Sequence, residues 1–307
     1  MKDTVLVTKD LTKRYGSTAA VNHVNMTIGK GQIYGLVGRN GAGKTTIIRM
    51  VAAQNVASSG EIWLFGGHTS AELSAARARI GAMVEIPSFY PYLNARQNLE
   101  YYRIQRGIPG KHCVDEVLEL VDLAHTGKKT FKAFSLGMKQ RLGLALALMN
   151  HPDFLLLDEP INGLDPEGIV EFRNLLLKLN QEHGTTILLS SHILSELSNI
   201  ATHYGFLDKG NLLEETSAKA LHEKCRACLQ LTVDDAGKAV ITLERQLNLH
   251  DYEVLPGNVL RVFDYLNRPQ DVTAALIQQG VAIFGVESKG SNLEDYFLTL
   301  IGGDKHA

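Results

Sequence analysis

The sequence lacks a long apolar segment. Its longest apolar run, LGLALALM, covers only residues 142–149, whereas a helix that spans a membrane needs about 18 or more such residues. The first residues, MKDTVLVTKD, also lack the pattern of a signal peptide. We therefore expect a soluble, cytoplasmic protein, so that any membrane partner must be a separate chain.

Cysteine is scarce, with three residues in the chain, Cys113, Cys225 and Cys228. This is too few for a disulfide framework. Cys225 and Cys228 form a CxxC pair, and His222 lies three residues before it. A structural zinc site normally needs four ligands, and the neighbouring sequence does not supply the fourth. We therefore predict reduced thiols without a metal.

The sequence also has no block of Lys or Arg. Its 31 basic residues are balanced by 33 acidic ones, which gives a net charge of −2. A nucleic-acid-binding domain usually carries a basic stripe, so the composition argues against nucleic acid as a partner. A length of 307 residues with 45% hydrophobic residues suffices for one large domain or two ordinary ones.

The first two thirds of the chain alternate between apolar strand patterns and helical patterns. Residues 32–38, 154–158 and 185–191 are predicted to be buried parallel strands. Residues 165–184 have the pattern of an amphipathic helix that Asp165 caps. This alternation predicts an α/β fold with a parallel sheet.

Residues 94–150 are predicted to be mostly helical, beginning at a cap residue, Asn94, and to form a subdomain inserted between strands. From about residue 228 the pattern changes to β-α-β-β-α-β, which is the ferredoxin-like order. A last helix opens with a capping box of Ser291 and Glu294. We therefore predict two domains, residues 1–218 and a small α+β domain, 219–307.

The segment GRNGAGKT fits the phosphate-loop pattern G-x-x-x-x-G-K-[ST], and it lies between a predicted strand and a predicted helix, as the pattern requires. Its residues are Gly38, Arg39, Asn40, Gly41, Ala42, Gly43, Lys44 and Thr45, and Thr46 follows. Backbone N–H groups of such a loop surround phosphates, and the helix start adds positive potential. Lys44 can reach the β- and γ-phosphates of ATP, and Thr45 can bind Mg²⁺.

Two acids follow an apolar strand in FLLLDEP, residues 154–160. Asp158 is predicted to hold the metal, through Thr45 or a water. Glu159 is predicted to be the general base that orients the attacking water. A second candidate anion site is the helix start in FSLGMKQR, where Ser135 and Gly137 lie.

These motifs together resemble the ATP-binding subunits of ABC transporters. In that family an α/β cassette combines the phosphate loop, a signature sequence at 134–138 and the acid pair. The segment INGLD, residues 161–165, resembles the loop that joins two subunits. His192, in SSHILSE, takes the place of the switch histidine, and Tyr15, in LTKRYG, that of the aromatic residue that stacks on adenine.

The resemblance narrows to the bacitracin-export and lantibiotic-immunity ATPases through GQIYGLVGRNGAGKTTIIRM, FSLGMKQRLG, SSHILSE and the final LEDYFLTLIGG. It implies an ATPase that uses Mg²⁺, pairs with a second cassette and drives separately encoded membrane subunits. Such a subunit is peripheral on the inner face of a bacterial membrane. In the pair, ATP lies between the phosphate loop of one copy and Ser135 and Gly137 of the other.

Two positions depart from the general family. Leu136 replaces the first glycine of the signature L-S-G-G-Q, and Glu85 stands where a glutamine is usual. Because the peptide-antibiotic group also has glutamate there, we predict that Glu85 is a switch residue that contacts Mg²⁺ or water. Five of the 21 aromatic residues follow it between residues 89 and 102, and we predict that they belong to a surface that docks the membrane subunit.

Two other functions fit parts of these patterns. A soluble ABC ATPase that acts on DNA has a long coiled coil between loop and signature, but Lys44 and Ser135 are only 91 residues apart. Relatives that act on ribosomes carry two cassettes in one chain, and this chain has one. A nucleotide sensor without turnover requires loss of the base, whereas Glu159 is present.

Overall fold

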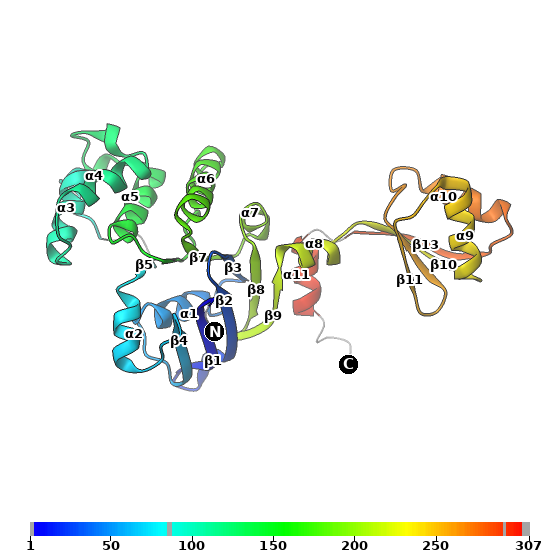
Figure 1. Cartoon of the computed structure of the whole chain (residues 1–307), viewed down its shortest axis with the longest axis horizontal. Helices are drawn as coiled ribbons and strands as arrows, with labels where there is room; N and C mark the ends of the chain where they lie inside the picture. The colour runs from blue at the N-terminus through cyan, green and yellow to red at the C-terminus, as the bar shows by residue number, and fades with distance from the viewer. Residues whose placement is uncertain (1–2, 85–87, 291–292, 303–307) are drawn as a thin grey trace. The chain divides into compact units, whose positions relative to one another are not determined.

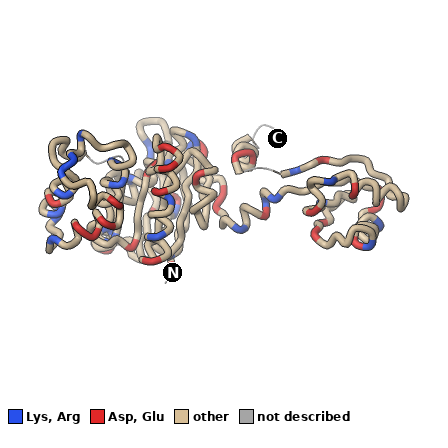
Figure 2. The backbone as a smooth tube through the Cα atoms, turned by 90° about the horizontal axis from the view of Figure 1, so that it is seen from above, with Lys and Arg blue, Asp and Glu red and all other residues tan. Residues whose placement is uncertain are grey.

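The computed structural model of the chain describes residues 3–84, 88–290 and 293–302. It forms two compact units, Met1–Ala218 and Lys219–Ala307, which are coloured along the chain in Figure 1. Figure 2 shows that basic and acidic residues are interspersed along both units. In the described part of the chain, no helix has both the length and the apolar composition that crossing a membrane requires.

Two sheets form the centre of the first unit. The three-stranded antiparallel sheet has the order β2-β1-β4, with β1 Thr4–Tyr15, β2 Thr18–Gly29 and β4 Ser59–Leu64. The six-stranded sheet has the order β5-β6-β7-β3-β8-β9. Its strands are β3 Ile33–Gly38, β5 Ile80–Met83, β6 Phe154–Leu157, β7 Thr186–Ser191, β8 His203–Asp208 and β9 Asn211–Ser217.

The apolar runs at 32–38, 154–158 and 185–191 form central strands of the larger sheet. Every residue of β3, β6 and β7 is buried, and neighbouring strands from β5 to β8 pair in parallel. Such strands are uniformly apolar because helices and sheets cover both of their faces. The predicted buried parallel strands are therefore confirmed, and β9 adds an antiparallel edge.

One hydrophobic core joins the two sheets through α1, Lys44–Val51. Ile47, Ile48 and Val51 of this helix are fully buried, among strand residues of both sheets such as Leu6 and Leu36. Burying side chains of this size stabilises the fold by about 1.5–3 kcal/mol each. The packing therefore fixes where α1 begins, directly after the glycine loop.

The helical insert consists of α3 Ala95–Gln105, α4 His112–Leu120, the short helices η1 Ala124–Thr126 and η2 Phe131–Ala133, and α5 Leu136–Leu148. These helices lie together in Figure 1. Asn94 caps α3 as predicted, since its side chain accepts a hydrogen bond of 2.9 Å from the N–H of Gln97. The start of α5 is capped by Ser135.

The remaining helices of this unit are α2 Ser70–Arg77, α6 Pro166–His183 and α7 Leu194–Leu197. The predicted cap of α6 is confirmed, because Asp165 Oδ1 accepts a hydrogen bond of 3.1 Å from the N–H of Gly168. Gly184 ends the helix with a φ of 66°, a left-handed conformation that glycine adopts without a steric cost.

From residue 228 on, the second unit has the predicted order of helices and strands, and a helix that was not predicted, α8, precedes it. Its elements are α8 Ala218–Lys224, β10 Cys228–Val233, α9 Ala236–Leu247, β11 Tyr252–Leu255, β12 Val259–Val262, α10 Pro269–Gln278, β13 Ile283–Lys289 and α11 Leu293–Gly302. The sheet has the order β11-β12-β10-β13, and all neighbours are antiparallel. Its buried face packs on α9 and α10. Ser291, of the predicted capping box, lies outside the described residues.

Candidate nucleotide site

The carboxyl ends of the central parallel strands bring the predicted site residues to one edge of the sheet. The glycine loop follows β3, Asp158 and Glu159 follow β6, and His192 follows β7. Strand β7 lies between β6 and β3. Ligands of open parallel sheets bind beyond these strand ends, so the topology alone collects residues that are far apart in the sequence.

Two glycines of the loop occupy places where a side chain cannot fit. A Cβ at Gly38 would come within 2.5 Å of the Leu207 carbonyl oxygen. A Cβ at Gly43 would lie 2.5 Å from the Ala20 carbonyl oxygen, and the φ of Gly43 is 112°. Glycine at both positions lets the loop pack closely against the sheets and turn directly into α1, whose first N–H groups can then face an anion.

Lys44 is 5% exposed and lies at the first position of α1. Its Nζ donates hydrogen bonds to the carbonyl oxygens of Gly38, at 2.7 Å, and Arg39, at 3.3 Å. It also forms an ion pair of 3.1 Å with Glu159 Oε1. The oxygens hold the ammonium group inside the curve of the loop, where it can meet the phosphate oxygens of a nucleotide.

Thr45 and Asp158 meet across the end of the sheet. Thr45 Oγ1 donates a hydrogen bond of 2.7 Å to Asp158 Oδ2. A hydroxyl and a carboxylate are the hard oxygen ligands that Mg²⁺ prefers, and Mg²⁺ usually binds one or two protein ligands together with substrate phosphates. The donor set therefore fits this ion. The next residue, Thr46, lies half-buried in the first turn of α1.

Glu159 has a left-handed backbone, with a φ of 47°. This conformation is uncommon for a residue other than glycine, and it is found at functional sites. The carboxylate of Glu159 lies between Lys44 and His192. Its Oε1 contacts the ammonium group of Lys44, and its Oε2 lies 2.7 Å from His192 Nδ1. The side chains of Glu159 and His192 are 22% and 31% exposed, so a water molecule can reach both.

Ser190 also belongs to this cluster and was not predicted from the sequence. Its Oγ donates a hydrogen bond of 2.6 Å to Asp158 Oδ1 and accepts one of 2.9 Å from the N–H of Glu159. The side chain is fully buried. A signal was available, because the apolar run TTILLSS ends in two hydroxyl residues at the edge of the sheet where ligands bind.

Glu196, on α7, is a third carboxylate near the acid pair. Burial raises the pKa of its carboxyl above the ordinary value of 4.5. The positive potential of His192 lowers the pKa, while the negative charge of Glu159 raises it. The surroundings of Glu196 therefore disfavour its charged form next to the carboxylate of Glu159.

Tyr15 ends β1, and its side chain is 51% exposed. Its hydroxyl accepts a hydrogen bond of 2.7 Å from Asn55 Nδ2, and the Nζ of Lys13 lies 5.2 Å from the ring centre. Asn55 follows α1 closely and was not predicted. These contacts hold an aromatic ring at the surface, where its face can meet a planar base.

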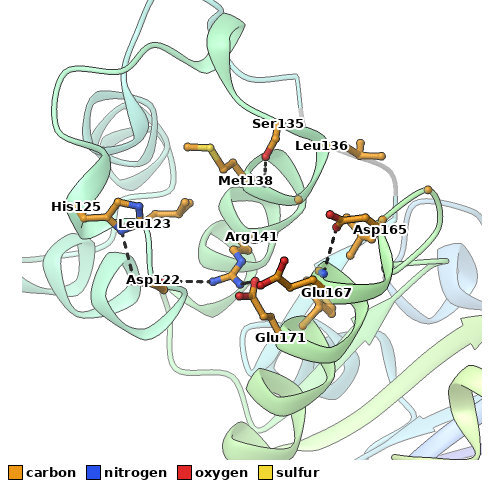
Figure 3. A pocket seen from close by; sticks show the side chains of 15 residues that line it. Asp122, Leu123, His125, Ser135, Leu136, Met138, Arg141, Asp165, Glu167 and Glu171 are labelled. Carbon is orange, nitrogen blue, oxygen red and sulfur yellow. Dashed lines mark hydrogen bonds and ion pairs between the residues drawn. The ribbon is translucent and has the colours of Figure 1, made fainter.

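Ser135 and Gly137 line a separate cavity of about 550 Å³, whose walls come from residues 122–172 (Figure 3). Ser135 Oγ accepts a hydrogen bond of 3.3 Å from the N–H of Met138. Leu136 opens α5 and is 40% exposed, and its side chain packs toward Gly163. The unusual leucine therefore leaves the helix start of the signature intact.

An ion-pair cluster in the same cavity was also not predicted. Arg141 of α5 contacts Glu171 of α6, and its Nη1 lies 3.7 Å from Asp122 Oδ2 (Figure 3). Asp122 Oδ1 lies 3.4 Å from His125 Nδ1. These contacts join α5 of the helical insert to α6, which lies outside the insert. Charge spacing within one helix could not reveal them, because the partners are 30 and 19 residues from Arg141.

Glu85 lies outside the described residues. The aromatic residues after it have different environments. Phe89 is 6% exposed and packs edge-on against Tyr102, so it belongs to the core of the insert. Tyr92 is 78% exposed, whereas Tyr90 and Tyr101 are 43% and 41% exposed. The ring centroids of Tyr90 and Tyr101 are 4.7 Å apart.

Three features together define the nucleotide site of a phosphate-loop protein: a glycine loop after a strand, a lysine and a hydroxyl at a helix start, and the two carboxylates that follow β6. Comparison with known proteins narrows this class. Residues 21–162 match the model of the family described as ABC transporter. The chain is 44% identical over 300 residues to the bacitracin transport ATP-binding protein BcrA of Bacillus licheniformis, with 98% of each chain covered.

It is also 40% identical over 211 residues to the lantibiotic transport ATP-binding protein SrtF of Streptococcus pyogenes, covering 69% of this chain and 90% of that one. A bacterial ABC transporter cassette, solved as a dimer, matches with a TM-score of 0.63 at 25% identity, covering 69% of this chain and 98% of that chain. The chain belongs to the family of ABC transporter ATP-binding proteins, which confirms the resemblance drawn from its motifs.

Proposed function

We propose that the chain is the ATP-hydrolysing subunit of an ABC exporter that expels peptide antibiotics of the bacitracin or lantibiotic type. The observation that carries this proposal is the 44% identity to a bacitracin transport subunit across 98% of both chains. The cluster of Lys44, Thr45, Asp158 and Glu159 supports it, because it brings an ammonium group, a hydroxyl and two carboxylates together at the start of α1.

In this proposal the loop residues 38–43 and Lys44 bind the phosphates, and Tyr15 stacks on adenine. Thr45 and Asp158 would hold Mg²⁺, which supplies positive charge next to the β- and γ-phosphates when bound. Glu159 accepts a proton from the attacking water. The contact of 2.7 Å with His192 orients the Glu159 carboxylate, and the imidazole is proposed to hold the water or the γ-phosphate.

We further propose that two cassettes bind ATP between them. Ser135 and Gly137 line a cavity whose walls come from residues 122–172. The phosphate loop, residues 38–45, does not line this cavity. A second copy can place its signature helix start on the γ-phosphate, where helix N–H groups favour an anion. The dimeric state of a solved relative agrees with this arrangement.

The membrane subunits are proposed to be separate chains that bind the insert. Tyr90, Tyr92 and Tyr101 offer exposed aromatic side chains of the kind that anchors protein interfaces. Glu85 is proposed to transmit the state of the nucleotide to this surface. The cassette would then lie peripherally on the inner face of the membrane.

The two compact units are proposed to be two domains, a nucleotide-binding domain of residues 1–218 and an accessory domain of residues 219–307. The β-α-β-β-α-β order and the antiparallel pairing of the second unit support a ferredoxin-like fold. Its core is its own, formed by residues such as Leu231, Leu243 and Leu276.

The test is resistance to peptide antibiotics in a sensitive bacterium. The strain expresses the chain together with a candidate membrane subunit from the same organism, and growth is measured against bacitracin and a lantibiotic. We expect resistance to at least one of them, and its loss when Glu159→Gln replaces the parent. Full ATPase activity of the purified chain without any resistance would contradict export of these peptides while leaving hydrolysis established.

A further inference from the structure

Among the residues that the structure describes, Ser190 is the only side chain whose hydrogen bonds join Asp158 to Glu159. It lies at the penultimate position of β7 and is fully buried. Its hydroxyl oxygen is 2.6 Å from Asp158 Oδ1 and 2.9 Å from the backbone nitrogen of Glu159. One atom therefore contacts the two residues that follow β6 and carry the acidic chemistry of the site.

The direction of both hydrogen bonds is fixed by chemistry. A hydroxyl has one proton and can accept through its lone pairs. The backbone N–H of Glu159 can only donate, so the Ser190 oxygen must accept there, and its single proton is left for the Asp158 carboxylate. The hydroxyl consequently cannot rotate away from the carboxylate without losing that charge-assisted bond, which is among the stronger kinds.

Each contact restrains a different property of the site. The bond to Asp158 Oδ1 orients the carboxylate so that Oδ2 faces Thr45 Oγ1 at 2.7 Å. The bond to the N–H of Glu159 holds a residue whose φ is 47°, a strained conformation that persists only where the surroundings enforce it. The direction in which the Glu159 side chain leaves the backbone depends on that conformation.

We propose that Ser190 is a positioning residue for ATP hydrolysis, which sets the metal-binding carboxylate and the general base together through one buried hydroxyl. The inference rests on the proposed roles of Asp158 and Glu159. It assigns Ser190 no contact with the substrate.

The test compares Ser190→Ala and Ser190→Thr in the full chain with the parent. The control is Thr186→Val, which removes a fully buried hydroxyl from the other end of β7, where Thr186 Oγ1 accepts a hydrogen bond from the N–H of Gly31 at 2.9 Å. For each purified variant, Tm, kcat, KM for ATP and the half-saturating Mg²⁺ concentration are measured.

For Ser190→Ala we expect kcat to fall about 10-fold or more and the half-saturating Mg²⁺ concentration to rise by a similar factor, as when other partners of metal ligands are removed. KM should change less, because the glycine loop and Lys44 still bind the phosphates. Ser190→Thr keeps the hydroxyl and should stay closer to the parent in kcat and in Mg²⁺ dependence. Thr186→Val should keep both at the parent values.

A folded Ser190→Ala protein with the parent kcat and Mg²⁺ dependence would overturn the inference. So would losses in Ser190→Ala that match those of Thr186→Val, since the hydroxyl would then only stabilise the strand. Glu159→Gln separates this failure from failure of the proposed function. If Glu159→Gln hydrolyses ATP like the parent, the assignment of the base is wrong, whatever Ser190 does.

Discussion

Two helices of this chain begin at predicted phosphate-binding motifs, and their surroundings differ. The start of α1 lies among buried or half-buried polar groups from three strands, and Lys44 alone contacts Gly38, Arg39 and Glu159. The start of α5 has its own cap, Ser135, and borders a cavity of about 550 Å³. The first site is organised within one chain, whereas the second presents a helix start to an open space.

We propose that the two helix starts have different roles. A chain that carries both the phosphate-binding loop and the general base can bind the nucleotide without a second chain. A helix start with an open cavity can add its N–H groups only when another molecule brings a phosphate to it. We infer that the phosphate loop determines binding and that the signature helix determines whether bound ATP is enclosed and hydrolysed.

The largest effect is expected from removing the base of the organised site. Glu159→Gln should lower kcat about 100-fold or more, because the amide cannot accept the proton of the attacking water. Binding of ATP should persist, and ATP should then hold two copies together. Phosphate release and light scattering with ATP measure the two effects. Hydrolysis at near the parent rate would assign the base to another residue and break the comparison.

The next effect concerns the open site. Gly137→Asp should fold, because a Cβ there would lie 3.7 Å from its nearest neighbour, Leu164 Cδ2. The added carboxylate would repel a phosphate at the start of α5, so kcat should fall about tenfold or more. The Kd of the isolated chain for ATP should stay near that of the parent. Gly137→Ala is the matched control without charge. A large loss of ATP binding in Gly137→Asp would show that the two sites are not separate.

A smaller effect is expected at the adenine end of the organised site. Tyr15→Ala should raise KM for ATP roughly tenfold, since stacking of a base on an aromatic ring contributes about 1–3 kcal/mol. Tyr15→Phe keeps the ring and loses only the hydrogen bond from Asn55, so its KM should lie nearer to that of the parent. An unchanged KM in Tyr15→Ala would remove Tyr15 from the site.

The smallest effect concerns the pH dependence of stability at Glu196. Its pKa in the folded protein is raised above the ordinary 4.5, so folding favours the protonated carboxyl. The stabilising contribution is therefore present below about pH 4.5 and is lost as the pH rises through the raised pKa. Glu196→Gln stays neutral, so its Tm should exceed that of the parent by a few degrees above this window, with a smaller difference below it. Equal differences at all pH values would exclude a role for the charge.

The local features of this protein follow from its amino-acid sequence. The apolar runs defined β3, β6 and β7, because a strand that is covered on both faces must be apolar throughout. Asn94 and Asp165 defined helix starts, because their side chains can accept hydrogen bonds from the first free N–H groups. The spacing of GRNGAGKT defined a phosphate loop, since glycines are required where a Cβ would meet another backbone segment.

Which distant side chains meet depends on the tertiary fold. Ser190 contacts residues 31 and 32 positions earlier, and Arg141 contacts one 30 positions later. Such pairs follow from strand order and helix packing, which a local pattern does not contain. The aromatic cluster shows the same limit, because Phe89 is buried while Tyr92 is 78% exposed. Composition places rings in a segment, but the packing of α3 against its neighbours decides which of them reach solvent.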